Sequence, residues 1–287
     1  MSIIPQLVIN SVIAGSVYAL VALGFNLIYS TTRFFNLAHG ALAAVGGYVV
    51  FFLMQRMGLG VILSILIAVI VTGLAGYLLD KAIYLPLRKK KASSMVLLVA
   101  SLGVFTVVQA IIAIIFTSQF QSFSQNIKTT THNFFGGVIT SVQLVTFISS
   151  ITVMTGIILI LKKTTFGRAV RAIGDDEEVA KIIGINTNKI IGQVFFIGSA
   201  VAGLAGVLIG FDTGIEPTMG FTLLLKGVIA AIIGGMGNVY GAFLGAFLLG
   251  FAENFGIWKI SGEWKDAIAF ALLILFLLFR PQGIIKK

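Results

Sequence analysis

The residues best suited to binding chemistry lie in one stretch, residues 166–190, which reads FGRAVRAIGDDEEVAKIIGINTNKI. A run of four acids at 175–178 stands out in a chain that is only 10% charged. Acidic side chains favour the first turn of a helix, where the helix dipole stabilises them. We therefore expect a break at Gly174, a short helix that begins with the acids, and a helix end at Gly184.

The expected helix carries Val179, Ile182 and Ile183 at spacings i, i+3 and i+4, which place them on one face. The preceding residues, 166–171, predict a short basic amphipathic stretch. A helix with one apolar face and charged ends can dock in a groove of a partner protein. The alternative is a helix that rests on lipid headgroups, but an anionic membrane surface would repel its acidic start. The pattern thus favours a docking surface.

Other ionisable side chains near the apolar segments are few. A lone histidine such as His39 is more often a hydrogen-bonding residue than a proton relay. Lys226 and Glu253 lie near the ends of their segments, and we expect both to reach toward water. Without an acid–base pair at the centre of a span, an ion-coupled carrier is disfavoured.

Motifs for catalysis are missing from the sequence. It has no G-x-x-x-x-G-K-[ST] loop for nucleotide phosphates, no H-E-x-x-H metal motif and no G-x-S-x-G elbow. The chain is therefore predicted not to be an enzyme and to hold no cofactor. If it performs energised work, another subunit must supply the energy.

Composition predicts an all-α, polytopic membrane protein. The 287 residues are 58% hydrophobic with a mean hydropathy of +1.06, and 33 are glycine, which lets membrane helices pack closely. The start, MSIIPQLVIN, lacks a basic region and is interpreted as a first span rather than a cleaved signal. We expect residues 1–287 to form one transmembrane domain.

Basic residues are clustered, and clusters of this kind mark the cytoplasmic side. Fourteen of the twenty lie in residues 81–91, 162–189 and 280–287. Residues 117–142 contain Lys128 as their one basic residue and are rich in Ser, Thr, Gln and Asn. The sequence therefore predicts a cytoplasmic loop at about 162–189 and an outside loop at about 117–142.

Charge-free apolar runs predict eight or nine membrane segments, since a span takes about 20 helical residues. The sequence GGMGN at 234–238 should break one run into two shorter pieces. If all nine cross, the N-terminus lies outside and the C-terminus inside, in agreement with the basic clusters. If the piece around 222–234 is instead re-entrant, the C-terminus lies outside, against the rule. The runs are 1–32, 34–55, 57–79, 92–127, 129–161, 190–211, 227–252 and 267–279.

Two glycine-rich segments, 35–52 and 235–251, are loosely alike, because each opens with Asn and Gly and continues with small residues. Segments interrupted by glycine in corresponding halves of transporters tend to line the pathway. The alternative is ordinary small-residue helix packing. The pathway candidates are Asn36, His39, Gly40, Gly235 and Asn238.

Several motifs together closely resemble the permease subunits of branched-chain amino acid ABC importers. They are VINSVIAGSVYALVALGFNLIYSTTRFFNLAHG, TTFGRAVRAIGDDEEVAKIIGINTNKI, KGVIAAIIGGMGNVYGAFLGAFLLGFAE and the terminal RPQG. The resemblance covers nearly the whole chain. It implies an α-helical permease of a bacterial cytoplasmic membrane that passes aliphatic amino acids.

The resemblance also implies partners and coupling residues. It implies a second homologous permease, an extracytoplasmic substrate-binding protein and two ATPase subunits, which would bind the ATP. The 162–189 loop resembles the loop through which such permeases contact their ATPase. The implied coupling positions are Gly167, Arg168, Arg171, Glu178, Ala180 and Gly184.

The sequence leaves other functions open. Ala41 stands where permeases of this kind often carry Glu, and relatives with similar loops move urea or short amides. A related importer for urea, amides or other amino acids is therefore an alternative. A self-sufficient channel or carrier and a non-transporting scaffold are less favoured.

Overall fold

The computed structural model describes residues 3–123, 130–134 and 136–285. Lys128, Lys286 and Lys287, which belong to the charge pattern above, lie outside the described residues. The elements, in chain order, are α1 (Ile3–Thr32), α2 (Ala38–Gln55), α3 (Val61–Leu79), a π-helical turn (Asp80–Tyr84), α4 (Leu85–Lys89), α5 (Ser94–Phe116), β1 (Thr131–Phe134), β2 (Gly137–Thr140), α6 (Ser141–Lys163), α7 (Thr165–Asp175), α8 (Glu177–Ile182), α9 (Thr187–Thr213), α10 (Met219–Gly234), α11 (Val239–Gly256), a 3₁₀ turn (Gly262–Trp264) and α12 (Lys265–Phe279).

Seven of the helices are long and apolar enough to cross a membrane: α1, α2, α3 with its extension to Lys89, α5, α6, α9 and α11. Helices α10 and α12 are shorter, with 16 and 15 residues. Together they agree with the eight or nine segments that the apolar runs predict. The predicted break at GGMGN is confirmed, because α10 ends at Gly234 and α11 begins at Val239.

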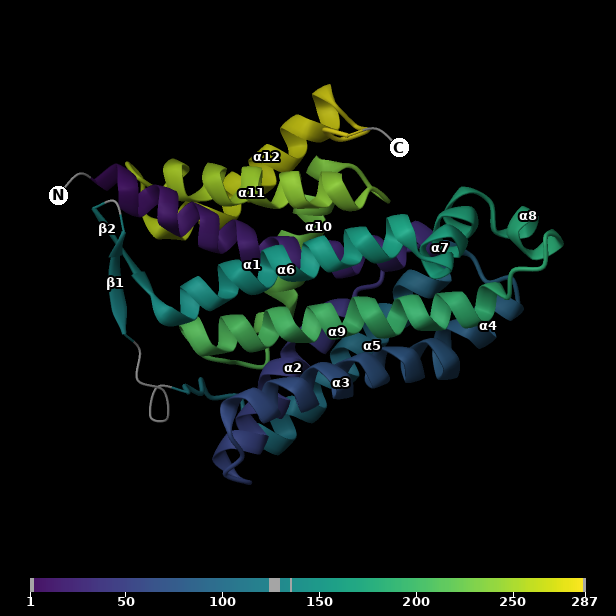
Figure 1. Ribbon diagram of the computed structural model, residues 1–287, viewed down its shortest axis with the longest axis horizontal. Coiled ribbons are helices and arrows are strands. Elements are labelled where there is room, and N and C mark those ends of the chain that lie inside the picture. Colours follow the sequence, from purple (N-terminus) through teal and green to yellow (C-terminus); the bar gives the residue numbers. More distant parts are fainter. Residues whose placement is uncertain (1–2, 124–129, 135, 286–287) are drawn as a thin grey trace.

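Most of these helices run along the long axis of the molecule (Figure 1). One end, here called the basic end, carries α4, α7 and α8. The opposite end, here called the hairpin end, carries β1 and β2 (Figure 1). Helix α1 runs from the hairpin end to the basic end, and α12 runs in the same direction (Figure 1). The basic stretches 81–91 and 162–189 thus lie at the same end.

Helix boundaries follow from side chains that replace missing backbone partners. Ser93 accepts from Val96 N at the start of α5, and Asn186 accepts from Lys189 N at the start of α9. Thr140 and Gln143 form a reciprocal capping box at the start of α6. These caps fix the residue at which each helix begins, so local sequence decides where these spans start.

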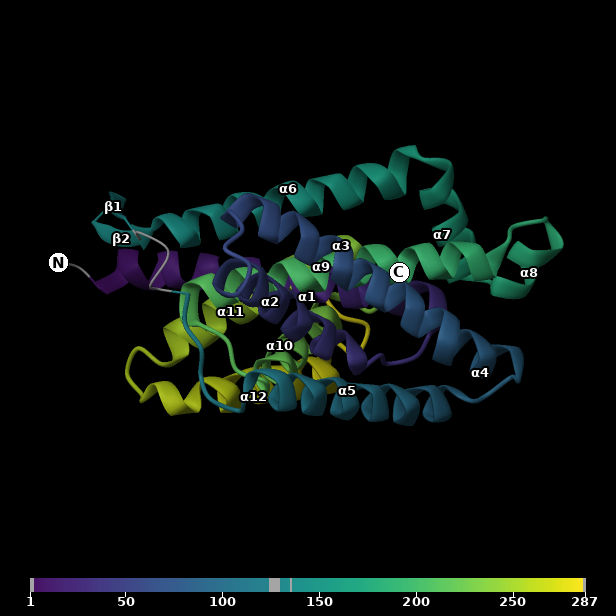
Figure 2. The same ribbon diagram turned by 90° about the horizontal axis from the view of Figure 1, so that it is seen from below.

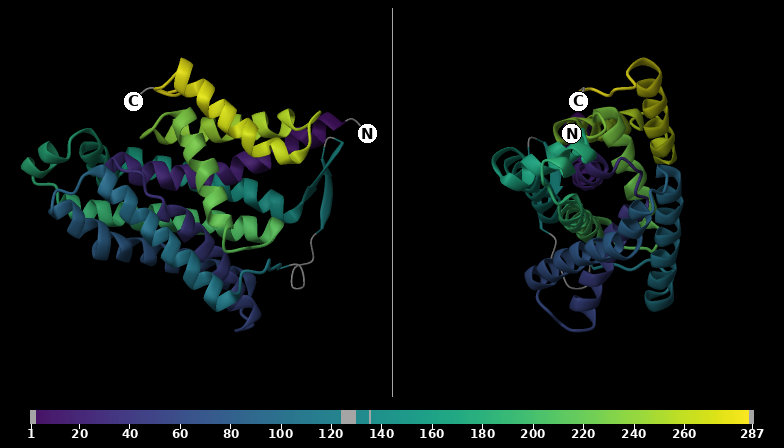
Figure 3. Two further views of the ribbon diagram at one scale, coloured as in Figure 1. Left: turned by 180° about the vertical axis from the view of Figure 1, so that it is seen from behind. Right: turned by 90° about the vertical axis from the view of Figure 1, so that its right-hand side faces the viewer.

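Helix α1 is the core of the bundle, surrounded by α6, α9, α10 and α11 (Figure 3, right). Small residues let the helices around it approach closely. A Cβ at Gly46 of α2 would collide with the carbonyl oxygen of Gly203 in α9, and a Cβ at Gly40 with that of Gly220 in α10. Close packing of this kind drives the association of membrane helices, because lipid is as apolar as the helix surfaces and the hydrophobic effect does not favour one contact over the other.

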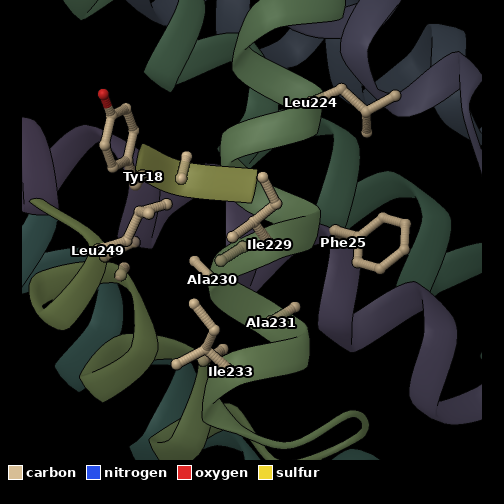
Figure 4. Packing of buried hydrophobic residues seen from close by; sticks show 13 residues of the cluster. Tyr18, Phe25, Leu224, Ile229, Ala230, Ala231, Ile233 and Leu249 are labelled. Atoms are coloured by element: carbon tan, nitrogen blue, oxygen red, sulfur yellow. The ribbon is translucent and has the colours of Figure 1, made fainter. Parts of the chain in front are cut away.

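One buried cluster joins α1, α10 and α11, with Ala269 of α12 at its edge. Figure 4 shows Phe25, Ile229, Ala230 and Leu249 packed in it. Because α10 crosses the long axis obliquely (Figures 1 and 3), it brings α11 and α12 into contact with the centre of the bundle.

The predicted outside loop contains a β-hairpin that the sequence pattern did not indicate. Thr131 pairs with Thr140 and Phe134 with Gly137 in an antiparallel register. The side-chain amide of Gln6 donates to the Val138 carbonyl (3.1 Å), and its oxygen accepts from the Val138 amide (2.8 Å). The hairpin is thereby attached to the first turn of α1.

Candidate functional site

A helical corner at the basic end is formed by α6, α7 and α8. Thr164 caps α7 by accepting from Gly167 N at 3.0 Å. A Cβ at Gly167 would collide with backbone atoms of Leu161, so this position must lack a side chain for α7 to fold back on α6. Gly167 is buried and therefore acts in shaping the corner.

The second part of the corner is α8. The Asp176 carboxylate accepts from Glu178 N (2.8 Å) and Val179 N (3.1 Å) and so caps the helix. The expected break at Gly174 is wrong, because α7 continues through Gly174 to Asp175. An exposed cap two residues later, rather than a glycine, separates the two helices. The expected end is confirmed, because α8 stops at Ile182 and Gly184 has a φ of +88°.

The two faces of α8 differ sharply. Ala180 is fully buried and packs toward α7 and α9, whereas Val179, Ile182 and Ile183 are 52%, 83% and 66% exposed. We call these three residues the apolar tip. Lys181 lies between Glu177 (3.1 Å) and Glu178 (3.2 Å), and its hydrogen bond to Glu177 contributes most to raising the pKa of its ammonium group.

The corner is connected to the bundle by polar and apolar contacts. The Arg33 guanidinium donates to the Gly174 carbonyl, and the Thr187 hydroxyl donates to Glu177 at 3.2 Å. Val170 and Ile173 belong to the same buried cluster as residues of α1 and α9. A force on α8 is therefore passed to α1, α6 and α9.

The six coupling positions implied by the resemblance are split by the structure. Gly167 and Ala180 are buried packing positions. Arg168, Arg171, Glu178 and Gly184 are exposed on the corner. The Arg171 guanidinium donates to the Leu161 carbonyl, which fixes α7 against α6. Contact with a partner stays a prediction for all six.

A cavity of about 390 Å³ lies between the corner and the start of α11. Arg171 and Gly174 line it from α7, and Asn238 and Tyr240 line it from α11. Lys162 Nζ lies 5.0 Å from the centre of the Tyr240 ring, a cation–π contact between α6 and α11. The corner thus faces the predicted pathway segment at 235–251.

The first group of pathway candidates is buried in the chain. The Tyr84 hydroxyl donates to Asn36 Oδ1 at 3.0 Å. His39 Nε2 lies 3.3 Å from the Val21 carbonyl oxygen, and its ring meets the Phe25 ring edge-on at 6.2 Å between centres. Asn36, His39 and Gly40 are all buried, against the π-helical turn, α1 and α10 respectively, and a pathway role stays a prediction.

The second group, Gly235 and Asn238, forms the turn between α10 and α11. Asn26 of α1 holds this turn, because its amide donates to the Asn238 carbonyl at 2.8 Å and its oxygen accepts from Gly237 N at 2.5 Å. The Asn238 side chain caps α11. Backbone bonds from Ile284 to Ile233 (2.9 Å) and from Ile285 to Gly234 (3.1 Å) attach the C-terminal segment to the same turn.

The likeness between the two glycine-rich segments is only partial in three dimensions. Asn238 caps its helix, but the side chain of Asn36 makes no cap bond to α2, which begins after Leu37. The two asparagines therefore do different structural work.

The expectation that Lys226 and Glu253 reach water is wrong. Lys226 Nζ lies 2.5 Å from Glu253 Oε1, and both residues are buried, 5% and 0% exposed. The two positions are 27 residues apart, and only the packing of α10 on α11 brings them together. One lysine and one glutamate in two apolar segments could have indicated this ion pair, because charges inside membranes are rarely unpaired.

A second buried charge lies at the basic end. Asp80, fully buried in the π-helical turn, forms an ion pair with Arg88 at 2.8 Å. Arg88 therefore has a structural partner as well as its place in a basic cluster. Among the described residues, no group of three or more His, Cys, Asp or Glu could hold a metal ion. The corner formed by α6, α7 and α8 is suited to docking and movement. The buried ion pairs are suited to holding helices together.

Comparisons with known proteins give one consistent result. Residues 7–277 match a family model described as the permease component of branched-chain amino acid transport systems. The high-affinity branched-chain amino acid permease BraD of Pseudomonas aeruginosa is 35% identical, with 98% of this chain and 95% of that protein covered. The permease LivH of Escherichia coli K12 is 33% identical with the same coverage.

A solved structure also shares the fold. PsaBC from Streptococcus pneumoniae in complex with Fab superposes with a TM-score of 0.53 over 98% of this chain and 93% of that one. The sequence identity is 13%, so this likeness concerns the fold alone.

Proposed function

The chain belongs to the permease components of branched-chain amino acid transport systems, and on that premise we propose that it passes aliphatic amino acids across the cytoplasmic membrane as a subunit of an ABC importer. It is a multi-pass membrane transport subunit of a family of permeases, not of catalytic enzymes. ATP is then bound and hydrolysed by separate partner subunits.

The apolar tip of α8 is the observation that carries the proposal. Ile182 and Ile183 are largely exposed at the basic end, which the basic stretches predict to face the cytoplasm. Exposed apolar residues on a short helix fit a groove on a partner protein. The charges of Glu177, Glu178 and Lys181 around the tip add a polar rim, as protein interfaces typically have.

A mechanism follows from how the corner is attached. ATP binding would draw two ATPase subunits together, and each would move the α8 it holds. Because Arg33 and Thr187 join the corner to α1 and α9, this movement tilts central spans of the bundle. The cavity beside Asn238 and Tyr240 leaves room for the corner to shift against α11. Alternating tilts would open the pathway to one side and then the other.

The partners we propose are two ATPase subunits, an extracytoplasmic substrate-binding protein and a second homologous permease. The face formed by α5 and α12 supports the last of these. Both helices are mostly exposed, and they lie on one face of the bundle, apart from each other, with α10 between them (Figure 3). A second permease on this face would enclose a pathway to which each chain contributes half.

The test is purification of the tagged chain from its native membrane in mild detergent, followed by reconstitution. Co-purification of two ATPases and a permease, with ATP-driven leucine uptake into vesicles that contain the loaded binding protein, supports the proposal. Uptake by this chain alone, without any ATPase, would instead identify a channel or carrier. Uptake of urea or short amides in place of leucine would correct the substrate.

A further inference from the structure

An ionic cluster joins four helices in the half of the bundle nearer the hairpin end. Lys226 of α10 lies at its centre, 2.5 Å from Glu253 of α11 and 2.7 Å from Asp266 of α12. The Tyr18 hydroxyl of α1 donates to the other oxygen of Glu253 at 2.7 Å. Lys265 Nζ lies 3.9 Å from that same oxygen. The formal charges of these five groups sum to zero.

The cluster joins the middle of α1 to the start of α12. Tyr18 stands near the middle of α1, on the edge of the buried apolar cluster, with its hydroxyl directed away from that cluster (Figure 4). Trp264, 55% exposed, immediately precedes α12 and marks the water–membrane boundary, where tryptophan is enriched. Asp266 is the second residue of α12, so it lies just below this boundary.

The two carboxylates differ in exposure. The Glu253 side chain is fully buried, whereas that of Asp266 is 68% exposed. Glu253, with Tyr18 and Lys226 as partners, is a satisfied structural group. An exposed carboxylate next to an apolar helix is favoured where it faces water or protein, because lipid does not stabilise its charge. Asp266 therefore points to water or a partner at this level of α12.

Apart from the cluster itself, the helices of this face carry little charge. It lies on the face formed by α12 and α5, with α10 between them, where the proposed pathway half would run (Figures 2 and 3). Helices α2 and α5 contain no charged residue, and Lys226 is the one charged residue of α10. A solute that moves along this face would meet the exposed Asp266 first, with Lys265 beside it and Lys226 buried behind it.

We propose that Lys226 and Asp266 bind the charged head group of the amino acid as it enters the pathway. The substrate carboxylate would contact the Lys226 ammonium, and the substrate ammonium would contact the Asp266 carboxylate. The exchange replaces one ion pair with two and leaves the net charge unchanged. Glu253 would hold Lys226 in place throughout, as a positioning residue. This inference rests on the proposed function.

The exchange explains why such a site would be weak enough to release substrate. In the closed arrangement Lys226 and Asp266 satisfy each other at 2.7 Å, so the substrate must compete with an existing ion pair. Competition lowers affinity without removing the preference for a solute that carries both charges. A permease needs this property, because conduction requires leaving as well as entering.

The test uses the complete importer in vesicles with its ATPases and leucine-loaded binding protein. The main variant is Asp266→Asn, chosen because the exposed side chain changes charge with little change in shape. Leucine imported per ATP hydrolysed should fall about tenfold, the size expected for losing one charge-assisted contact. ATPase stimulation by the binding protein should stay at the wild-type level. Asp266→Glu should restore most of the import.

Glu263→Gln is the matched control, since Glu263 is an exposed acid three residues away in the same segment; it should change nothing. An Asp266→Asn variant with unchanged import per ATP would overturn the proposal. A parallel fall of import and hydrolysis would also overturn it, because that result assigns Asp266 only to holding α12. Absence of ATP-driven leucine uptake in the wild type would contradict the proposed function itself, and this inference with it.

Discussion

Lys226 Nζ and Glu253 Oε1 lie 2.5 Å apart, and this buried ion pair joins two helices that the sequence GGMGN separates. Helices α10 and α11 bury the pair against Tyr18 of α1. A charge in this place is stable only when its partner is present, because desolvation costs several kcal/mol per ion. The pair thus makes the packing of α10 dependent on α11.

Lys226→Met should destabilise the protein more than removal of both charges. The single change leaves Glu253 buried without its cation, at a cost of about 3–5 kcal/mol. The double variant Lys226→Met with Glu253→Gln keeps an acceptor for Tyr18 and should recover most of that loss. The measurement is the thermal unfolding midpoint in detergent. Equal midpoints for the single and double variants would show that the pair is not coupled.

Ile182→Asp should separate the permease from its ATPases. The change puts a charge in the apolar tip, at a side chain that is 83% exposed and supports little of the fold. We expect co-purified ATPase to fall at least about tenfold, as for loss of an apolar anchor at an interface, with the unfolding midpoint unchanged. Val138→Asp, in the hairpin at the other end, is the control. ATPase retention by Ile182→Asp would contradict the docking role of α8.

Gly167→Ala should disturb the α6–α7 corner. The added Cβ would collide with the backbone of Leu161, and overpacking of this kind costs about 1–3 kcal/mol. We expect α7 to be displaced and leucine uptake to fall while membrane insertion continues. Gly156→Ala in the neighbouring helix α6 has open space for its Cβ and should transport normally. Similar uptake by the two variants would remove Gly167 from the corner mechanism.

Asn26→Leu should loosen the turn between α10 and α11. Asn26 bonds both Gly237 and Asn238, and loss of these buried bonds costs about 1–3 kcal/mol for each group left unpaired. Faster hydrogen exchange is expected at the amides of residues 235–241. Asn10→Leu, on the same helix but far from the turn, should leave that exchange rate unchanged. Unchanged exchange in Asn26→Leu would show that the C-terminal segment alone holds the turn.

Much of the architecture could be predicted because its causes are local. Charge-free runs of about 20 residues specify membrane helices, and basic stretches specify one side. The break at Gly234–Asn238 and the helix end at Gly184 were also predictable, since glycine adopts backbone conformations that other residues avoid. The acidic run likewise predicted α8, although the boundary lay at Asp176 rather than Gly174.

The candidate site was predicted less completely. Arg168 and Glu178 are exposed on the corner as a docking role requires, but Gly167 and Ala180 proved to be packing positions. A resemblance in sequence does not distinguish exposed contact residues from buried packing residues, because both are hard to replace. Only burial separates them.

The sequence by itself determined the spans, the basic end and the helix breaks, since each depends on neighbours within a few turns. The tertiary structure alone decided that Lys226 meets Glu253 and Asp266, and that Asn26 holds a turn more than 200 residues away. These contacts depend on which faces of distant helices meet. That choice is made by close packing at small residues such as Gly40 and Gly220, and no local pattern in the chain encodes it.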